Sequence, residues 1–160
     1  MIGNEYDMNK KLVLHVEDEM SHATLVKRWI TKKDFPIDYV HILDGEDALD
    51  YLFHQGKYQN SEGTSFPDLI LLDIRLPKIS GIDVLKRIKS DPRTQFIPTI
   101  MLSTSRADEN IIESYLNHAN SYLNKNLDLN EFYCMIDHMF NYWLFFNLVP
   151  EDEKTEYTKR

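Results

Sequence analysis

The sequence predicts an α/β protein built on a doubly wound, five-stranded parallel sheet with helices on both faces. Two observations support this fold class. Short apolar runs alternate five times with amphipathic, helix-like stretches along the 160 residues. Runs such as 69–72 are also continuously apolar, as expected for strands that helices cover on both sides. Right-handed crossovers between parallel strands would then place all five carboxyl ends at one edge of the sheet.

The first two strand–helix units are expected within residues 12–54. The apolar run 12–16 predicts a strand, and the helix expected over 19–33 ends before Pro36, because proline disfavours helix in the residue before it. A second strand is expected over 37–43 and a short helix over 46–54. The polar stretch 56–65 contains two glycines and is expected to be a surface loop.

The other three units are expected to extend to about residue 146. Strands are predicted over 68–73, 97–103 and 121–123, and helices over 82–90, 108–118 and 129–146. The apolar face of helix 108–118 is expected to consist of Ile111, Ile112, Tyr115 and Leu116. The tail 150–160 is charged and expected to be flexible, so that residues 1–149 would form a single domain.

Composition excludes several classes of function. The formal net charge is −8 and the isoelectric point about 5.2, which disfavours binding to nucleic acid or to an anionic membrane surface. Cys134 is the only cysteine, so no internal disulfide can form, and it is expected to be a buried thiol. The N-terminus lacks the apolar core of a signal peptide, and no apolar run approaches the length of a membrane helix. We therefore expect a cytoplasmic protein.

Polar side chains follow four of the expected strands, at the edge where open α/β folds bind ligands. An acid after a strand is most often a helix cap or a solvated turn residue. Helix capping alone would nevertheless rarely place polar residues at the ends of four strands in the order seen here. The residues are Glu17, Asp18, Asp73, Ser103, Thr104 and Lys125.

The chemistry of these groups favours phosphoryl transfer. Converging carboxylates repel unless a cation lies between them, so Glu17, Asp18 and Asp73 predict a site for a hard cation, most plausibly Mg²⁺. The hydroxyl of Ser103 and the ammonium of Lys125 suit the oxygens of a phosphoryl group. Asp73 is the expected nucleophile, because it ends the central strand, whereas the other two acids form a pair suited to metal and water.

Four motifs at these strand ends resemble the receiver domain of two-component response regulators. They are VEDE at 16–19, LDIRLP at 72–77 followed by Gly81, LSTS at 102–105 and YLNK at 122–125. The resemblance extends from about Lys10 to Tyr142 and implies a flavodoxin-like receiver fold. The stretches 44–52 and 88–92 are similar to stand-alone regulators that are paired with bacterial phytochromes and similar sensor kinases.

The resemblance implies a role for each site residue. Asp73 would accept a phosphoryl group from a phosphohistidine on a sensor histidine kinase. Asp18, Asp73 and the backbone carbonyl of Arg75 would bind Mg²⁺ directly, and Glu17 would act through water. Ser103 would move to hydrogen-bond the phosphoryl group, Tyr122 would turn inward when it does, and Lys125 would contact the phosphoryl oxygens.

Two features depart from the pattern of the family. Asn126 follows Lys125 where the family usually has proline, often after a cis bond. A cis bond before a non-proline residue costs about 3 kcal/mol, so either this bond is trans or the site holds strain. Arg75 is bulky and charged at the lip of the site. It is either a solvated surface residue or, with Ser105, a modulator of phosphate lifetime.

The six histidines show no paired metal-binding spacing, and His15 is expected to be a satisfied core or edge residue. The last helix has more apolar residues than one buried face can hold. Its expected buried face consists of Leu129, Phe132, Ile136, Met139, Phe140 and Trp143. Outside this face lie Tyr133, Tyr142, Phe145, Phe146, Leu148 and Val149. Exposed aromatic surface usually marks an interface, which predicts a homodimer through the last helix, with Tyr133, Tyr142, Phe145 and Phe146 at the interface.

The function expected from the sequence is a phosphorylation switch that acts by binding another protein, because only a short tail follows the last helix. A phosphorelay carrier that passes its phosphate to a histidine phosphotransfer protein fits the same residues. An enzyme, such as a metal-dependent phosphatase, is disfavoured, because its general acid would occupy the position of Arg75. A flavin-binding relative would leave the acidic residues unexplained.

Overall fold

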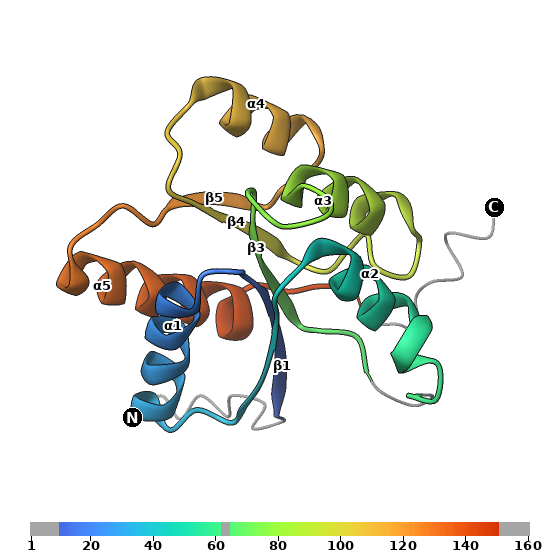
Figure 1. The fold of residues 1–160 in the computed structure, drawn as a ribbon. Helices are drawn as coiled ribbons and strands as arrows, with labels where there is room; N and C mark the ends of the chain where they lie inside the picture. The colour runs from blue at the N-terminus through green and yellow to red at the C-terminus, as the bar shows by residue number, and fades with distance from the viewer. Residues whose placement is uncertain (1–9, 62–64, 151–160) are drawn as a thin grey trace.

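The computed structural model of the chain describes residues 10–61 and 65–150. It confirms the predicted fold: five parallel strands form one sheet in the order β2-β1-β3-β4-β5, with a helix after each strand (Figure 1). The strands are β1 Lys11–Val16, β2 Ile37–Ile42, β3 Leu69–Asp73, β4 Thr99–Ser103 and β5 Ser121–Asn124. The α-helices are α1 Met20–Lys33, α2 Gly45–Phe53, α3 Gly81–Ser90, α4 Asp108–Leu116 and α5 Leu129–Phe140.

The two faces of the sheet are covered by different helices (Figure 1). Because side chains alternate along a strand, Ile70 and Leu72 of β3 pack with α2 and α3, while Leu69 and Leu71 pack with α1 and α5. All four of these side chains are fully buried, so β3 is the centre of the core. This explains why its sequence is continuously apolar rather than alternating.

Side-chain caps fix where several helices begin. Asp44 accepts a hydrogen bond from the backbone N–H of Asp47 at the start of α2, and Ser80 accepts one from Asp83 at the start of α3. Asp128 and Glu131 form a capping box at the start of α5. These caps place the helix starts just beyond the carboxyl ends of the strands, next to the polar edge of the sheet.

Some expected boundaries were wrong. The expected loop 56–65 contains a short 3₁₀ helix, η1 Gly56–Tyr58. The last helix is α-helical only to Phe140 and continues as wider π turns in η2 Asn141–Phe146. β4 begins at Thr99 rather than Ile97, directly after Pro98, which has no N–H for a strand ladder. The charged tail expected over 150–160 lies, apart from Pro150, outside the described residues.

Several side chains expected to be buried are exposed. Ile112, Tyr115 and Leu116 of α4 are 57%, 50% and 73% exposed, because α4 instead buries Ser114, whose hydroxyl donates to the carbonyl of Asn110. Leu129 is exposed because it is the first residue of α5. Cys134 is also exposed, contrary to expectation, because it lies on the outer side of α5. No helix among the described residues is long and apolar enough to cross a bilayer.

Candidate functional site

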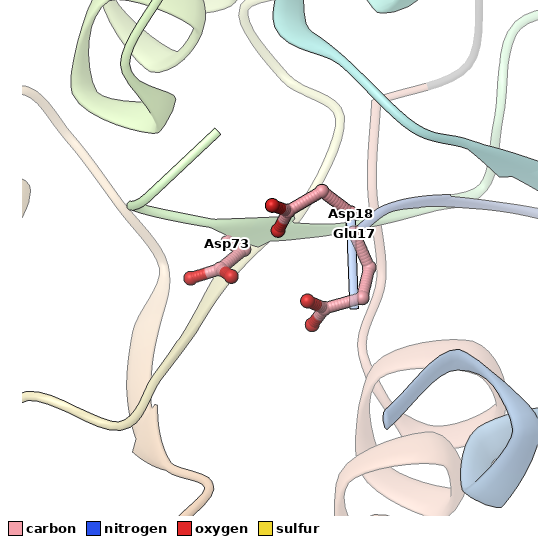
Figure 2. Close-up of side chains that lie close together, drawn as sticks. All are labelled: Glu17, Asp18 and Asp73. Carbon is pink, nitrogen blue, oxygen red and sulfur yellow. The ribbon is translucent and has the colours of Figure 1, made fainter. Parts of the chain in front are cut away.

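Three carboxylates converge at the carboxyl edge of the sheet, as the sequence predicts. Glu17 and Asp18 follow β1, and Asp73 is the last residue of the neighbouring strand β3. One oxygen from each lies within 4.8 Å of the others, and the three side chains face a common space (Figure 2). Within the described part of the chain, no other group of three acidic, histidine or cysteine side chains meets this criterion. Oxygen ligands at this spacing suit a hard divalent cation.

Lys125 joins two of these acids. Its Nζ donates to Oε2 of Glu17 at 2.6 Å and to Oδ2 of Asp73 at 3.1 Å, and its side chain is almost fully buried. The backbone N–H of Lys125 donates to the carbonyl of Ser103 at 2.8 Å, which extends the β4–β5 pairing by one residue and sets the position of the lysine. One ammonium thus offsets the repulsion between two buried carboxylates.

The charge state of Glu17 depends on this environment. Its side chain is fully buried, and burial raises its pKa from the ordinary value of 4.5 to about 7. The hydrogen bond from Lys125 acts in the opposite direction, and the nearby Asp73 carboxylate adds to the increase. The Glu17 carboxyl is therefore readily protonated near neutral pH, and a cation at the site would favour its charged form.

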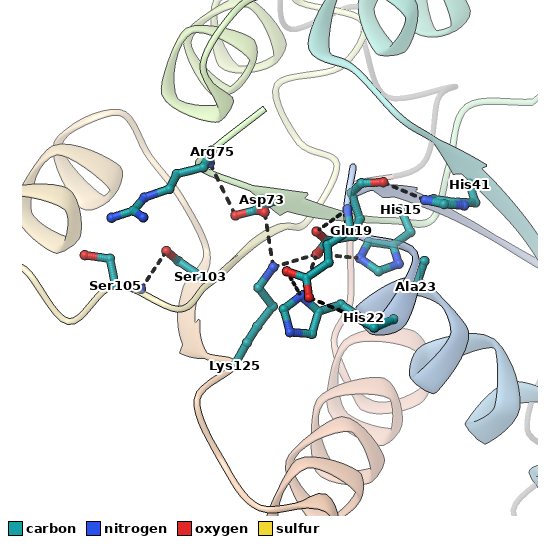
Figure 3. Close-up of polar contacts among 12 residues, drawn as sticks. His15, Glu19, His22, Ala23, His41, Asp73, Arg75, Ser103, Ser105 and Lys125 are labelled. Carbon is teal, nitrogen blue, oxygen red and sulfur yellow. Dashed lines mark hydrogen bonds and ion pairs between the residues drawn. The ribbon is translucent and has the colours of Figure 1, made fainter. Parts of the chain in front are cut away.

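A close backbone approach shapes the loop that follows Asp73. The N–H of Gly81 donates to the carbonyl of Ile74 at 2.8 Å. A Cβ at position 81 would lie 1.8 Å from the backbone oxygen of Asp73, so only glycine fits there. The N–H of Arg75 donates to Oδ1 of Asp73 at 3.3 Å, and the exposed Arg75 side chain extends in the direction of Ser105 (Figure 3).

Ser103, Ser105 and Tyr122 belong to one hydrogen-bonded network. Oγ of the buried Ser103 accepts from the N–H of Ser105 at 3.1 Å, and the Tyr122 hydroxyl donates to the Ser105 carbonyl at 2.9 Å. Oγ of Ser105 accepts from the N–H of Ala107 and from Nδ2 of Asn110. Ser105 therefore links the end of β4 to the start of α4 and to Tyr122 of β5.

The peptide bond after Lys125 is trans, since no cis bond occurs in residues 10–61 or 65–150. Of the two alternatives left open by the sequence, the one without strain is therefore correct. The N–H of Asn126 donates to Oδ1 of Asn124 at 2.7 Å, which stabilises the turn that carries the lysine. Lys125 reaches both carboxylates without the proline that is usual in the family.

Three histidines surround Glu17, a feature that the sequence analysis missed. Nε2 of His15 and Nδ1 of His22 lie 3.9 Å and 3.8 Å from Oε2 of Glu17, and Nε2 of His41 lies 2.7 Å from its backbone oxygen (Figure 3). His15 is fully buried and has a partner, because its Nδ1 lies 2.8 Å from the Tyr39 hydroxyl. Strand pairing could have revealed part of this group, since His15 and His41 are register partners on β1 and β2.

The residues expected at a dimer interface lie along α5 and η2 with unequal exposure. Tyr142 and Phe146 are 53% and 62% exposed. Tyr133 and Phe145 are partly buried against the cluster beneath α1 and α5. The exposed apolar surface of this region therefore consists mainly of Tyr142, Phe146 and the two residues Leu148 and Val149.

The sequence is similar to those of known proteins. The family model of the response regulator receiver domain matches residues 13–137. The probable methanogenesis regulatory protein FilR2 of Methanothrix harundinacea is 39% identical over 140 residues, which cover 87% of each chain. The response regulator Rcp1 of Synechocystis is 36% identical over 134 residues, covering 84% of this chain and 89% of Rcp1.

Solved structures agree with these sequence matches. The phosphorylated cyanobacterial phytochrome response regulator RcpA superposes with a TM-score of 0.82 at 36% identity, covering 88% of this chain and 99% of RcpA. The Mn²⁺-bound form of Rcp1 superposes with a TM-score of 0.81 at 34% identity, with the same coverage. The fold is therefore that of a receiver domain, and the chain belongs to this family.

Proposed function

Because the chain belongs to the response regulator receiver domain family, we propose that it is a phosphorylation switch whose phosphoryl acceptor is Asp73. The single observation that carries this assignment is Lys125, whose Nζ bonds both Glu17 and Asp73 beside the third acid, Asp18. A nucleophilic carboxylate that already contacts an ammonium has a partner for the charge that a phosphoryl group brings.

The proposed reaction moves a phosphoryl group from a phosphohistidine on a sensor histidine kinase to Asp73. The N–P bond of the donor breaks, and an O–P bond to an oxygen of the Asp73 carboxylate forms. Lys125 Nζ, 3.1 Å from Oδ2, offsets charge on the transferred group. In the proposed switch, the Ser103 hydroxyl donates a hydrogen bond to the transferred phosphoryl group after the loop that follows β4 moves.

Mg²⁺ is the proposed cofactor. Asp18, Asp73 and the backbone carbonyl of Arg75 would hold the ion, with Glu17 acting through water. When bound, it would offset negative charge on the phosphoryl oxygens. The three converging carboxylates support this proposal, as does the Mn²⁺ bound to the relative Rcp1.

The proposed switch runs through the hydrogen bonds of Ser105. When Ser103 turns toward the phosphoryl group, it gives up its bond from the Ser105 N–H, and the contacts of Ser105 with Tyr122 and Asn110 rearrange. This local change would alter the surface formed by α4, β5 and α5. The exposed side chains of Ile112, Tyr115 and Leu116 would form part of that output surface.

We further propose that residues 1–149 form a single receiver domain that works in the cytoplasm. A phytochrome-like sensor kinase is its proposed partner, since the similar protein RcpA is a cyanobacterial phytochrome response regulator. The same Asp73 could pass its phosphate to a histidine phosphotransfer protein, and a transfer assay separates this role from partner binding. Catalysis would be limited to phosphorylation and dephosphorylation of the chain itself, since position 75 offers no general acid.

The decisive test is Asp73→Asn. Acetyl phosphate with Mg²⁺ should label the wild-type chain with one phosphoryl group, detected by intact-protein mass spectrometry, and should leave the variant unlabelled. The variant removes one charge and keeps the shape, so its circular dichroism spectrum should match that of the wild type. Labelling of the variant at another residue would refute the assignment of Asp73.

A homodimer through α5 is the proposed assembly, with Tyr133, Tyr142, Phe145 and Phe146 at the interface. Tyr142 and Phe146 carry most of the exposed area. Light scattering at micromolar concentration should give the mass of a dimer for the wild type and of a monomer for Tyr142→Ser with Phe146→Ser. A wild-type monomer, both with and without phosphorylation, would exclude this interface.

Arg75 and Ser105 are proposed to modulate the lifetime of the phosphate. The Arg75 side chain lies at the lip of the site and extends toward Ser105 (Figure 3). Arg75→Ala and Ser105→Ala should each change the dephosphorylation rate by about threefold or more, through altered access of water. Rates equal to that of the wild type would remove this role, and Lys86→Ala on the outside of α3 serves as the control.

A further inference from the structure

The outer side of α5 carries two metal-ligating side chains that the proposed function does not use. Cys134 and His138 are both exposed and lie four residues apart, so they share one face of the helix. Sγ of Cys134 lies 3.6 Å from Nδ1 of His138. Cys134 is the only cysteine of the chain, so it has no disulfide partner within the chain.

The separation of these two atoms matches the geometry of tetrahedral zinc. With Zn–S at about 2.3 Å and Zn–N at about 2.05 Å, a tetrahedral angle places the sulfur and nitrogen about 3.6 Å apart. The observed separation of 3.6 Å agrees with this value. The two side chains therefore already lie at the spacing of two ligands on one ion, without a change of rotamer.

The described part of the chain does not supply the other two ligands. Oδ1 of the adjacent Asp137 pairs with Lys33 at 2.6 Å, and Oε2 of Glu131 accepts from the N–H of Asp128. No third histidine, cysteine or acid of residues 10–61 and 65–150 lies close enough to form a group with this pair. A tetrahedral site at Cys134 and His138 therefore needs ligands other than the described residues of the same chain.

We propose that two copies of the chain share one Zn²⁺, bound by Cys134 and His138 of each copy. A two-fold axis beside α5 would bring the same pair from the second copy to the ion, giving two sulfur and two nitrogen ligands. The exposed Tyr142 and Phe146 continue at intervals of four residues along the helix from His138. The metal site and the aromatic surface would thus belong to one interface, and this inference rests on the homodimer proposed above.

Zinc binding at this site leaves the net charge of the interface unchanged, so the coordination bonds must outweigh the repulsion between the two copies. Each chain has a formal net charge of −8, so two copies repel each other over any shared surface. On binding, each thiol loses its proton, and the ion replaces two protons with two positive charges at the centre of the interface. The Zn²⁺ and the two thiolates then sum to zero charge, with the neutral imidazoles completing the coordination. Binding releases two protons for each ion, so affinity should increase with pH.

The test uses the full-length chain, reduced with a phosphine and kept in excess Mg²⁺ so that the acidic cluster is saturated. Titration with ZnCl₂ should convert the chain to a dimer by light scattering, with saturation at one zinc per two chains by elemental analysis. Co²⁺ in place of Zn²⁺ should give the intense near-ultraviolet charge-transfer absorption of thiolate ligation, which carboxylates do not produce. Zinc should lower the dissociation constant of the dimer about tenfold or more.

Cys134→Ser and His138→Ala should each abolish the zinc-dependent part of dimerisation. Cys134→Ser should also abolish the charge-transfer absorption. Both positions are exposed, so folding should be unaffected, and His118→Ala in the exposed turn after α4 is the control. The proposal is overturned if zinc binds one ion per chain without a change in mass. Zinc-dependent dimers that persist in Cys134→Ser would overturn it as well.

The outcomes separate this inference from the proposed function. A metal-free dimer on which zinc has no effect would reject the zinc site and retain the aromatic interface. A monomer that dimerises only with zinc would support the site while showing that the aromatic residues alone are insufficient. Labelling of Asp73 by acetyl phosphate in Cys134→Ser should equal that of the wild type, because phosphorylation does not depend on the outer face of α5.

Discussion

The carboxyl edge of the sheet and the outer face of α4 depart from the usual distribution of residues in opposite ways. At the edge, the charged side chains of Glu17, Asp73 and Lys125 are buried. On α4, the apolar side chains of Tyr115 and Leu116 are exposed. Both arrangements are unfavourable in isolation, since buried charge loses hydration and exposed apolar surface orders water.

The sheet edge and the outer face of α4 differ in how this unfavourable free energy is offset. At the edge, each buried charge contacts an opposite charge within the chain, at 2.6 Å and 3.1 Å from Lys125 Nζ. On α4, no described element covers the exposed apolar side chains of Tyr115 and Leu116. Buried charge is typical of a functional site within a chain, and exposed apolar surface is typical of an interface with a partner, so the two regions suit the two proposed roles.

Lys125→Met is expected to have the largest effect, because it removes the charge that joins the two carboxylates. Loss of the ammonium should lower the rate of phosphorylation by acetyl phosphate about 100-fold. Without metal, it should lower the free energy of unfolding by about 3 kcal/mol, because Glu17 and Asp73 then face each other unpaired. Urea denaturation with and without Mg²⁺ measures the second effect, which Mg²⁺ should reduce. A rate within threefold of the wild type would contradict the role of Lys125.

Gly81→Ala tests whether backbone packing fixes the edge. The new Cβ would lie 1.8 Å from the Asp73 carbonyl oxygen, so the loop after β3 must shift, at a cost of about 2–3 kcal/mol in the free energy of unfolding. Gly45→Ala is the comparison, because its Cβ would meet the side chains of Ile79 at 2.6 Å and Val84 at 2.8 Å and a backbone oxygen only at 3.0 Å, so it should cost less. Chemical denaturation of both variants measures the loss in the free energy of unfolding. Equal losses would show that the close approach of Gly81 to the backbone of Asp73 does not determine the stability of the edge.

The raised pKa of Glu17 predicts a pH dependence of stability in the absence of metal. Burial raises this pKa from 4.5 to about 7, so between these values the folded chain binds more protons than the unfolded chain. The stabilisation is full below pH 4.5 and is lost as pH rises through 7. Between pH 5 and pH 8, the wild type should lose about 2 kcal/mol relative to Glu17→Gln, measured by thermal unfolding in a chelator. Parallel pH profiles of the two proteins would contradict the assignment.

Tyr115→Ser with Leu116→Ser should have the smallest effect on the fold. These side chains are at least half exposed, so the free energy of unfolding should change by less than about 0.5 kcal/mol. Leu85→Ala in the fully buried core is the contrast and should cost about 3 kcal/mol. A large loss of stability in the α4 variant would show that the chain itself uses this surface. Reduced binding of a phosphorylation-dependent partner, with the fold intact, would support its role as an output surface.

The sequence was sufficient to predict the strands and the residues at their ends. A strand buried on both faces must be apolar throughout, so the run 69–72 identified β3, and parallel pairing brought Asp18, Asp73 and Lys125 to one edge. These features depend on local composition and on the handedness of crossovers, which are the same in most proteins of this fold class.

Side-chain orientation on the outer helices could not be predicted in the same way. In α4, periodicity indicated a buried apolar face, but docking turned the helix so that Ser114 is buried. Cys134 was expected to be buried, but the helix directs it outward. The histidines around Glu17 come from β1, α1 and β2, and their convergence requires the register of two strands and the position of a helix. Such information depends on tertiary packing rather than on the spacing of residues.

The strand order β2-β1-β3-β4-β5 has a consequence for the newly made chain. Synthesis proceeds from the N-terminus, so Asp73, the last of the three acids to be made, leaves the ribosome about 50 residues before Lys125. During that interval β1, β2 and β3 can pair, and the three acids meet with no ammonium between them. Protons or a divalent ion are then the available counter-charges. The nascent three-strand unit should therefore assemble more readily when free magnesium is abundant in the cell.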